Sequence, residues 1–154
     1  MVKESYDIDK ISFQLGMINC FVEMVACGVK KLALSPPIFP EDYKVIAKAS
    51  EGTVKGFGIK SYLEKSLLIT DLQSEEFTKD KWSILYYEDD HTLNAYLALK
   101  EKKQKFETSG RYERDARKEI AREFGRLLSY PEDKIEEKIS KDTPPTPFML
   151  HIDP

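Results

Sequence analysis

The chain has 154 residues, of which 41% are hydrophobic and 33% are charged, and it is long enough to form one globular domain with a substantial core. The formal net charge of −3 excludes a strong overall attraction to nucleic acids or to anionic membranes. The first ten residues are too acidic and polar for a secretory signal, so we expect a cytoplasmic protein. Lysine and glutamate are abundant whereas asparagine and glutamine are rare, a bias that indicates a thermophilic source.

The segment 11–29 is the most apolar part of the chain and predicts a helix, with Asp9 as its N-cap and Gly28 at its end. Its polar or small positions fall on one narrow stripe, formed by Ser12, Gly16, Asn19 and Glu23. We therefore expect the helix to be covered on nearly every side and to form the centre of the core. The polar residues in its middle argue against a membrane span.

Both cysteines lie on this helix, seven residues apart. Seven residues rise about 10.5 Å along a helix, whereas a disulfide needs Cα atoms within about 7 Å. Cys20 and Cys27 therefore cannot bridge each other within one helix. We expect two buried free thiols, as in a reducing compartment, and no metal site.

The remaining elements follow from hydrophobic periodicity and from turn residues. After the first helix we expect a strand over 31–35, a helix over 40–49, strands over 54–62, 67–69 and 82–87, and helices over 92–107, 111–129 and 131–140. This α-β-α-β-β-β-α-α-α order predicts an α/β or α+β fold, in which helices pack on a mixed sheet of about four strands.

The last residues differ in composition from the rest of the chain. We predict one globular domain over 1–141 and a proline-rich linker with an apolar tail over 142–154. Phe148 and Leu150 belong to this tail and are candidate binding residues, because an apolar end behind a stiff spacer can dock as an extra strand. The alternative is a disordered terminus.

Polar residues follow three of the expected strands. Ser35 follows the first, Asp71 follows the strand at 67–69, and Asp89, Asp90 and His91 follow the strand at 82–87. If these strands are parallel, the residues share one edge of the sheet, where they could act as acid and base or bind a divalent ion. The alternative is that Asp89 or Asp90 caps the next helix and that the others are solvated.

Two further patterns resemble binding motifs and fail in detail. The glycines between 52 and 58 lack the spacing of a phosphate-binding loop. A row of bases falls four residues apart on one helix face, formed by Arg114, Lys118, Arg122 and Arg126. Acids at 115, 119 and 123 lie within one helical turn of these bases, so we expect a salt-bridged surface and no nucleic acid partner.

The sequence Phe-Gly-Arg-Leu-Leu-Ser-Tyr-Pro at 124–131 resembles an uncharacterised, mainly archaeal protein family in which a helix ends in Arg-Leu-Leu-Gly-Tyr-Pro. Here Ser129 stands in place of the family's glycine. Glu132 and Asp133 occupy positions at which the family carries cysteines, so a thiol or metal role of those cysteines does not transfer. The resemblance covers the C-terminal half and implies kinship of fold, without an established activity.

The function that these patterns favour is a small binding or assembly module. We expect a homo-oligomer formed through the first helix, a sheet edge or the tail, because a very apolar helix and an apolar tail occur in a chain without a catalytic signature. The alternative is a metal- or nucleotide-dependent enzyme that uses Asp71, Asp89, Asp90 and His91. No particular cofactor follows from the sequence.

Overall fold

The computed structural model describes residues 7–140, and the predicted tail, with Phe148 and Leu150, lies outside this range. The described residues form five α-helices and three strands. In chain order they are α1 (Lys10–Ala26), β1 (Leu32–Leu34), α2 (Tyr43–Gly56), β2 (Lys60–Glu64), β3 (Ser83–Tyr87), α3 (Asp90–Thr108), α4 (Arg114–Leu127) and α5 (Glu132–Ile139). Short 3-10 turns at Pro40–Asp42 and Glu75–Phe77 complete the set.

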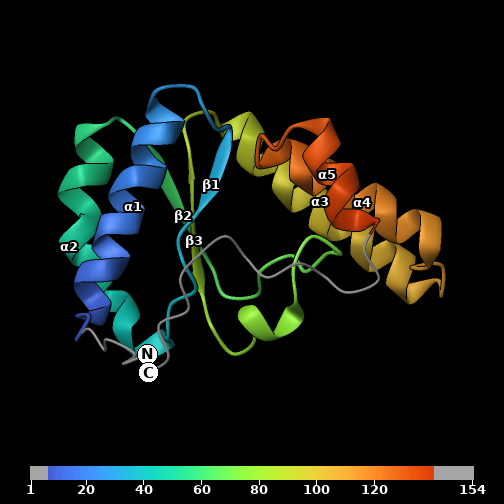
Figure 1. The fold of residues 1–154 in the computed structure, drawn as a ribbon, viewed down its shortest axis with the longest axis horizontal. Helices are drawn as coiled ribbons and strands as arrows, with labels where there is room; N and C mark the ends of the chain where they lie inside the picture. Colours follow the sequence, from blue (N-terminus) through green and yellow to red (C-terminus); the bar gives the residue numbers. More distant parts are fainter. Residues whose placement is uncertain (1–6, 141–154) are drawn as a thin grey trace, which may run out of the picture.

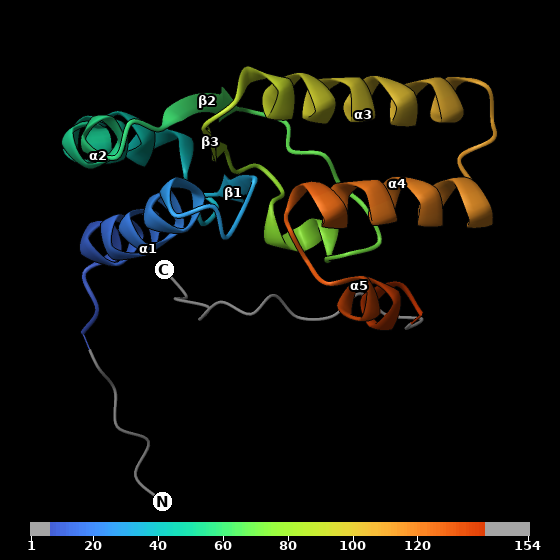
Figure 2. The ribbon, with the colours of Figure 1, turned by 90° about the horizontal axis from the view of Figure 1, so that it is seen from above.

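The three strands form one antiparallel sheet in the order β1-β3-β2. The α1 and α2 helices lie on one side of the sheet and α3, α4 and α5 on the other (Figure 1), with α4 between α3 and α5 (Figure 2). Residues of β3 alternate between the two cores: Ile84 and Tyr86 pack towards α1 and α2, whereas Leu85 and Tyr87 pack towards the other three helices. The central strand is therefore buried on both faces.

This architecture confirms the expected combination of helices and sheet, and it corrects the sheet, the end of α2 and residues 67–69. The sheet has three strands instead of four, and all are antiparallel, so it is not a mixed sheet. The α2 helix extends to Gly56, because Ile46, Ser50 and Val54 continue its buried stripe past the expected end at 49. Residues 67–69 reach the core without strand pairing: Leu67 and Leu68 are buried in a loop.

The α1 helix has the predicted ends but not the predicted burial. The Asp9 carboxylate accepts a hydrogen bond from the Ser12 N–H at 2.6 Å, and Gly28 has a φ of 75° at the C-terminal end. One stripe is buried, formed by Gln14, Ile18, Val22 and Val25. Both cysteines are exposed, so the expectation of buried thiols was wrong. The reason is that the sheet and α2 cover only one side of this helix.

Four helices end in the same hydrogen-bonded turn, the Schellman motif, in which one residue takes a left-handed conformation. Gly28, Gly58 and Gly110 fill this position after α1, α2 and α3. After α4 it is Ser129, with a φ of 62°, and the Tyr130 N–H closes the turn on the Gly125 carbonyl at 3.0 Å. The Arg-Leu-Leu-Ser-Tyr-Pro segment is therefore a helix C-cap at which glycine is the conformationally favoured residue.

Ser129 compensates for its strained backbone with a contact that glycine cannot make: its hydroxyl accepts a hydrogen bond from the Lys31 N–H at 2.9 Å. We expect Ser129→Ala to lower the free energy of unfolding by about 1 kcal/mol, because the bond is lost and the strain stays. Ser129→Gly should unfold close to the wild type, since relief of about 1–2 kcal/mol of strain offsets the lost bond. Urea unfolding of both variants tests this, and equal losses would contradict it.

Two of the four bases in the row on α4, Arg122 and Arg126, form ion pairs, but with partners that the sequence did not indicate. Arg122 binds Glu136 and Arg126 binds Glu132, each at 2.6 Å, so these bases tie α4 to α5. Of the predicted acids, Glu119 and Glu123 both bind Lys102 of α3. Helix spacing predicts these ion pairs within α4, but they form between α4 and the neighbouring helices α3 and α5.

Candidate functional site

The shared edge predicted for Ser35, Asp71 and 89–91 requires parallel strands, and β1 runs antiparallel to β3. The end of β1 therefore meets the start of β3, where the Ser35 hydroxyl accepts a hydrogen bond from the Ile84 N–H at 2.9 Å. Ser35 is 2% exposed and extends the ladder by a second bond, from its N–H to the Ile84 carbonyl at 2.8 Å. Asp89 follows the opposite end of β3, so Ser35 and Asp89 do not meet.

The residues after β3 form the start of α3, with Asp89 as its N-cap, which is the alternative to a shared site that the sequence leaves open. The Asp89 carboxylate accepts a hydrogen bond from the His91 N–H at 2.9 Å and caps α3. Asp90 is paired with Lys60 at 2.9 Å, and the His91 side chain is exposed. Within residues 7–140 no three His, Cys, Asp or Glu residues converge in a way that could hold a metal ion.

Asp71 lies away from these residues, on the loop after β2, where it contacts α4. Its carboxylate binds the Arg117 guanidinium through both oxygens, with the Nε contact at 3.3 Å. The pair lines a pocket of about 370 Å³, in which the Tyr112 ring lies 5.2 Å from Lys103 Nζ and 5.1 Å from Arg117 Cζ. Burial raises the pKa of Tyr112. Because Asp71 is engaged by Arg117, it is not a free general base in this pocket.

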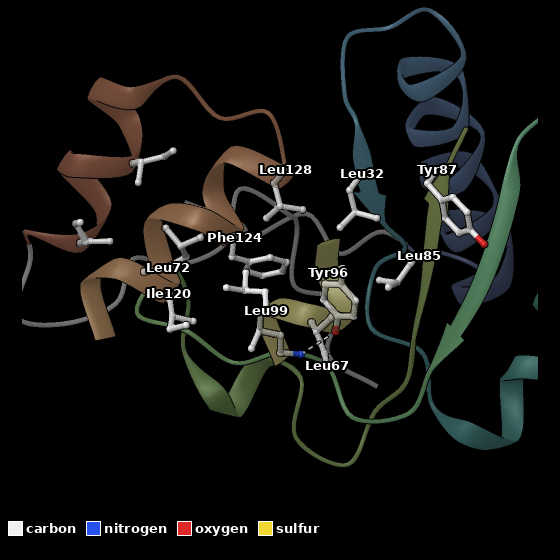
Figure 3. Packing of buried hydrophobic residues seen from close by; sticks show 14 residues of the cluster. Leu32, Leu67, Leu72, Leu85, Tyr87, Tyr96, Leu99, Ile120, Phe124 and Leu128 are labelled. Atoms are coloured by element: carbon white, nitrogen blue, oxygen red, sulfur yellow. Dashed lines mark hydrogen bonds between the residues drawn. The ribbon is translucent and has the colours of Figure 1, made fainter. Parts of the chain in front are cut away.

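A buried polar cluster between β2 and α3 has no counterpart in the sequence predictions. Glu64 is 5% exposed and accepts hydrogen bonds from Tyr96 Oη and Lys100 Nζ, both at 2.8 Å, and from the Ser66 N–H at 2.9 Å. The Tyr96 hydroxyl also accepts a hydrogen bond from the Leu68 N–H at 3.0 Å, and the Tyr96 ring packs among apolar side chains (Figure 3). With these contacts satisfied, the cluster fixes the loop after β2 against α3.

The four-residue spacing of Tyr96 and Lys100 on α3 was the signal that could have revealed this cluster, since such residues share one helix face.

The α1 helix carries apolar side chains that the described residues leave exposed or half-buried. Five apolar side chains outside its buried stripe, the last of them at the C-cap, follow a spacing of four, three, four and three residues. They are Phe13, Met17, Cys20, Met24 and Cys27, which we call the open seam. Cys20, Cys27 and Met24 are exposed, Met24 by 39%, and Phe13 and Met17 are half-buried. Alternating steps of four and three are the heptad spacing by which one helix packs along another.

Gly16 flanks the open seam and adds a second observation. Glycine inside a helix costs about 1 kcal/mol relative to alanine. A Cβ added at Gly16 would meet no atom within 4 Å, so no contact among the described residues requires glycine there. A small residue beside an apolar seam leaves room for the backbone of a second helix to approach closely.

Comparisons with family models, with curated proteins and with solved structures find no match to this chain. The resemblance at 124–131 therefore stays a prediction from the sequence. In the described part of the chain, no helix combines the length and apolarity needed to cross a bilayer.

Proposed function

We propose that this protein is a small assembly module in which two copies pair through the open seam of α1. The observation that carries the proposal is the heptad spacing of exposed and half-buried apolar residues outside the stripe that the fold itself buries. Pairing removes this apolar surface from water at a gain of about 25 cal/mol per Å². The seam itself carries no charge, so apolar burial is not opposed by desolvation of ions.

The same seam on a second copy is its best-matched partner. In a two-fold pair every residue of the patch meets the same patch, and a heptad seam is self-complementary in this sense. Stable interfaces bury about 1,200–2,000 Å² in total, which is more than one short helix seam supplies. We therefore expect a reversible dimer with a dissociation constant in the micromolar range.

Sedimentation velocity over a concentration series tests the pairing. We expect the wild-type chain to shift from monomer to dimer as its concentration rises, and Met24→Lys to stay monomeric because a buried ammonium is costly. Leu97→Lys is the matched control: Leu97 is 36% exposed, but it lies on α3, across the sheet from the seam. A wild type that stays monomeric, or an equal loss of dimer in both variants, would refute the proposal.

Cross-linking of the exposed thiols gives an independent test. Cys20 is the central residue of the seam. It therefore lies opposite Cys20 of the second copy in a parallel pair, and also in an antiparallel pair whose two-fold axis passes near Cys20. We expect mild oxidation to link two copies through Cys20 in a Cys27→Ser variant, with a yield that the Met24→Lys substitution abolishes. The Cys20→Ser variant should cross-link through Cys27 only if the helices are parallel.

A further inference from the structure

A cleft of about 410 Å³ lies between α2 and the strands β2 and β3, away from the open seam. Small side chains at Ala47, Ser50 and Ser61 leave this space unfilled. Its apolar walls are formed by Val54, Ile59, Leu63 and Ile84. Ligand sites commonly have volumes of about 300–1,000 Å³ and are lined mainly by apolar side chains with a few polar groups. The cleft matches that description in size and lining.

The polar group of the cleft that lacks a partner is the Tyr86 hydroxyl. Tyr86 is 1% exposed, and its Oη forms no hydrogen bond with any residue that the structure describes. The neighbouring Ser50 hydroxyl donates to the Ile46 carbonyl at 2.8 Å, so its proton is not available to Tyr86. Burial raises the pKa of Tyr86, so the hydroxyl is neutral and can donate. A buried donor without a partner destabilises the unoccupied protein.

Charged residues of α2 border the same cleft. Lys55 is paired with Glu51 at 2.5 Å, one helical turn away. Lys48 forms no ion pair with a residue in the range 7–140. The Lys48 side chain is exposed, whereas Tyr86 is buried. The cleft thus has a positive outer end, apolar walls and a hydrogen-bond donor at its inner end.

We infer that this cleft binds a small amphipathic organic acid whose carboxylate lies near Lys48, whose apolar body packs on Val54 and Ile84, and whose far end carries an oxygen that accepts a hydrogen bond from Tyr86. Such a ligand removes apolar wall area from water and supplies the partner that Tyr86 lacks. The inference is independent of the proposed pairing, because the cleft is lined by α2, β2, β3 and the turn between α2 and β2, and α1 contributes no residue to it.

Three small molecules of similar shape test the contributions of the two ends of the cleft separately. The first, 3-(4-hydroxyphenyl)propionate, carries both polar groups, 3-phenylpropionate lacks the hydroxyl, and 4-ethylphenol lacks the carboxylate. We expect the first to bind the full-length chain with a dissociation constant in the submillimolar range, as is typical of about a dozen non-hydrogen atoms. In amide NMR spectra its footprint should fall on α2, β2 and β3 and leave α1 unshifted. The other two probes should bind more weakly at the same place.

Two variants then test the two ends. Tyr86→Phe should weaken the hydroxylated acid by about three- to tenfold, the range expected for one hydrogen bond, and leave 3-phenylpropionate unchanged. Lys48→Met should weaken both acids by about two- to fivefold, the range for a solvent-exposed ion pair, and leave 4-ethylphenol unchanged. The inference is overturned if no probe shifts these amides, if the footprint falls on α1, or if Tyr86→Phe leaves the preference for the hydroxylated acid intact.

Discussion

Replacing Tyr96 with phenylalanine is expected to lower the free energy of unfolding by about 2–4 kcal/mol. The substitution removes only the hydroxyl, which donates to Glu64 at 2.8 Å and accepts from the Leu68 N–H at 3.0 Å. Both partners are buried, at 5% and 3% exposure, so water cannot replace the lost contacts. The Leu68 N–H would then be left without a partner, and Glu64 would keep Lys100 and Ser66.

The same substitution at Tyr86 is the matched control and should have the opposite sign. Tyr86 and Tyr96 are both fully buried, at 1% and 0% exposure, on opposite faces of the sheet. The Tyr86 hydroxyl has no partner in the described chain, so we expect Tyr86→Phe to raise the free energy of unfolding by about 1 kcal/mol. Urea unfolding of the two variants under identical conditions measures the difference, and losses of similar size would contradict the assigned hydrogen bonding.

Replacing Ile135 with alanine is expected to lower the free energy of unfolding by about 2–5 kcal/mol, the range for loss of a buried aliphatic side chain. Ile135 is 0% exposed and packs on Gly125, where its Cδ1 lies 2.8 Å from the position that a Cβ would occupy. The eight-residue α5 helix is too short to be stable alone and depends on this contact. Amide exchange in α5 should accelerate along with the global loss.

The ion pairs between α4 and α5 provide the control for that prediction. We expect the Arg122→Ala/Arg126→Ala double variant to shift the urea midpoint far less than Ile135→Ala, because exposed ion pairs contribute little. The hydrogen bonds from Arg126 lower the pKa of Glu132, so the contribution of this pair is present above the ordinary glutamate pKa and is lost as the pH falls through the lowered value. A double variant as unstable as Ile135→Ala would show that charge, and not burial, holds α5.

Local signals in the sequence located the ends of α1 correctly. Asp9 and Gly28 act through neighbours within a few residues, so their roles as N-cap and left-handed C-terminal residue follow from local backbone chemistry. The burial of α1 could not be predicted in the same way. An apolar side chain can be covered by its own chain or by another molecule, and the sequence pattern is the same in both cases.

The candidate site was the least predictable part. The sequence places Ser35 beside Asp89 only if their strands run parallel, and the direction of a strand has no signature in a stretch of five residues. The Glu64 cluster was missed because its residues are up to 36 positions apart, joining β2 to α3. The missing hydrogen bond of the Tyr86 hydroxyl could not be predicted for the same reason, because the partners of a hydroxyl depend on which elements pack around it.

The sequence by itself determined that the chain combines helices with a small sheet, where most helices begin or end, and that α1 carries more apolar surface than a helix with one covered face requires. These properties depend on hydrophobic periodicity and on caps, which act within a few residues. The tertiary structure alone decided that the strands are antiparallel, that the predicted acids are divided between a cap and separate ion pairs, and that a cleft remains between α2 and the sheet. Each of these depends on contacts between residues far apart in the chain, whose geometry no local pattern specifies.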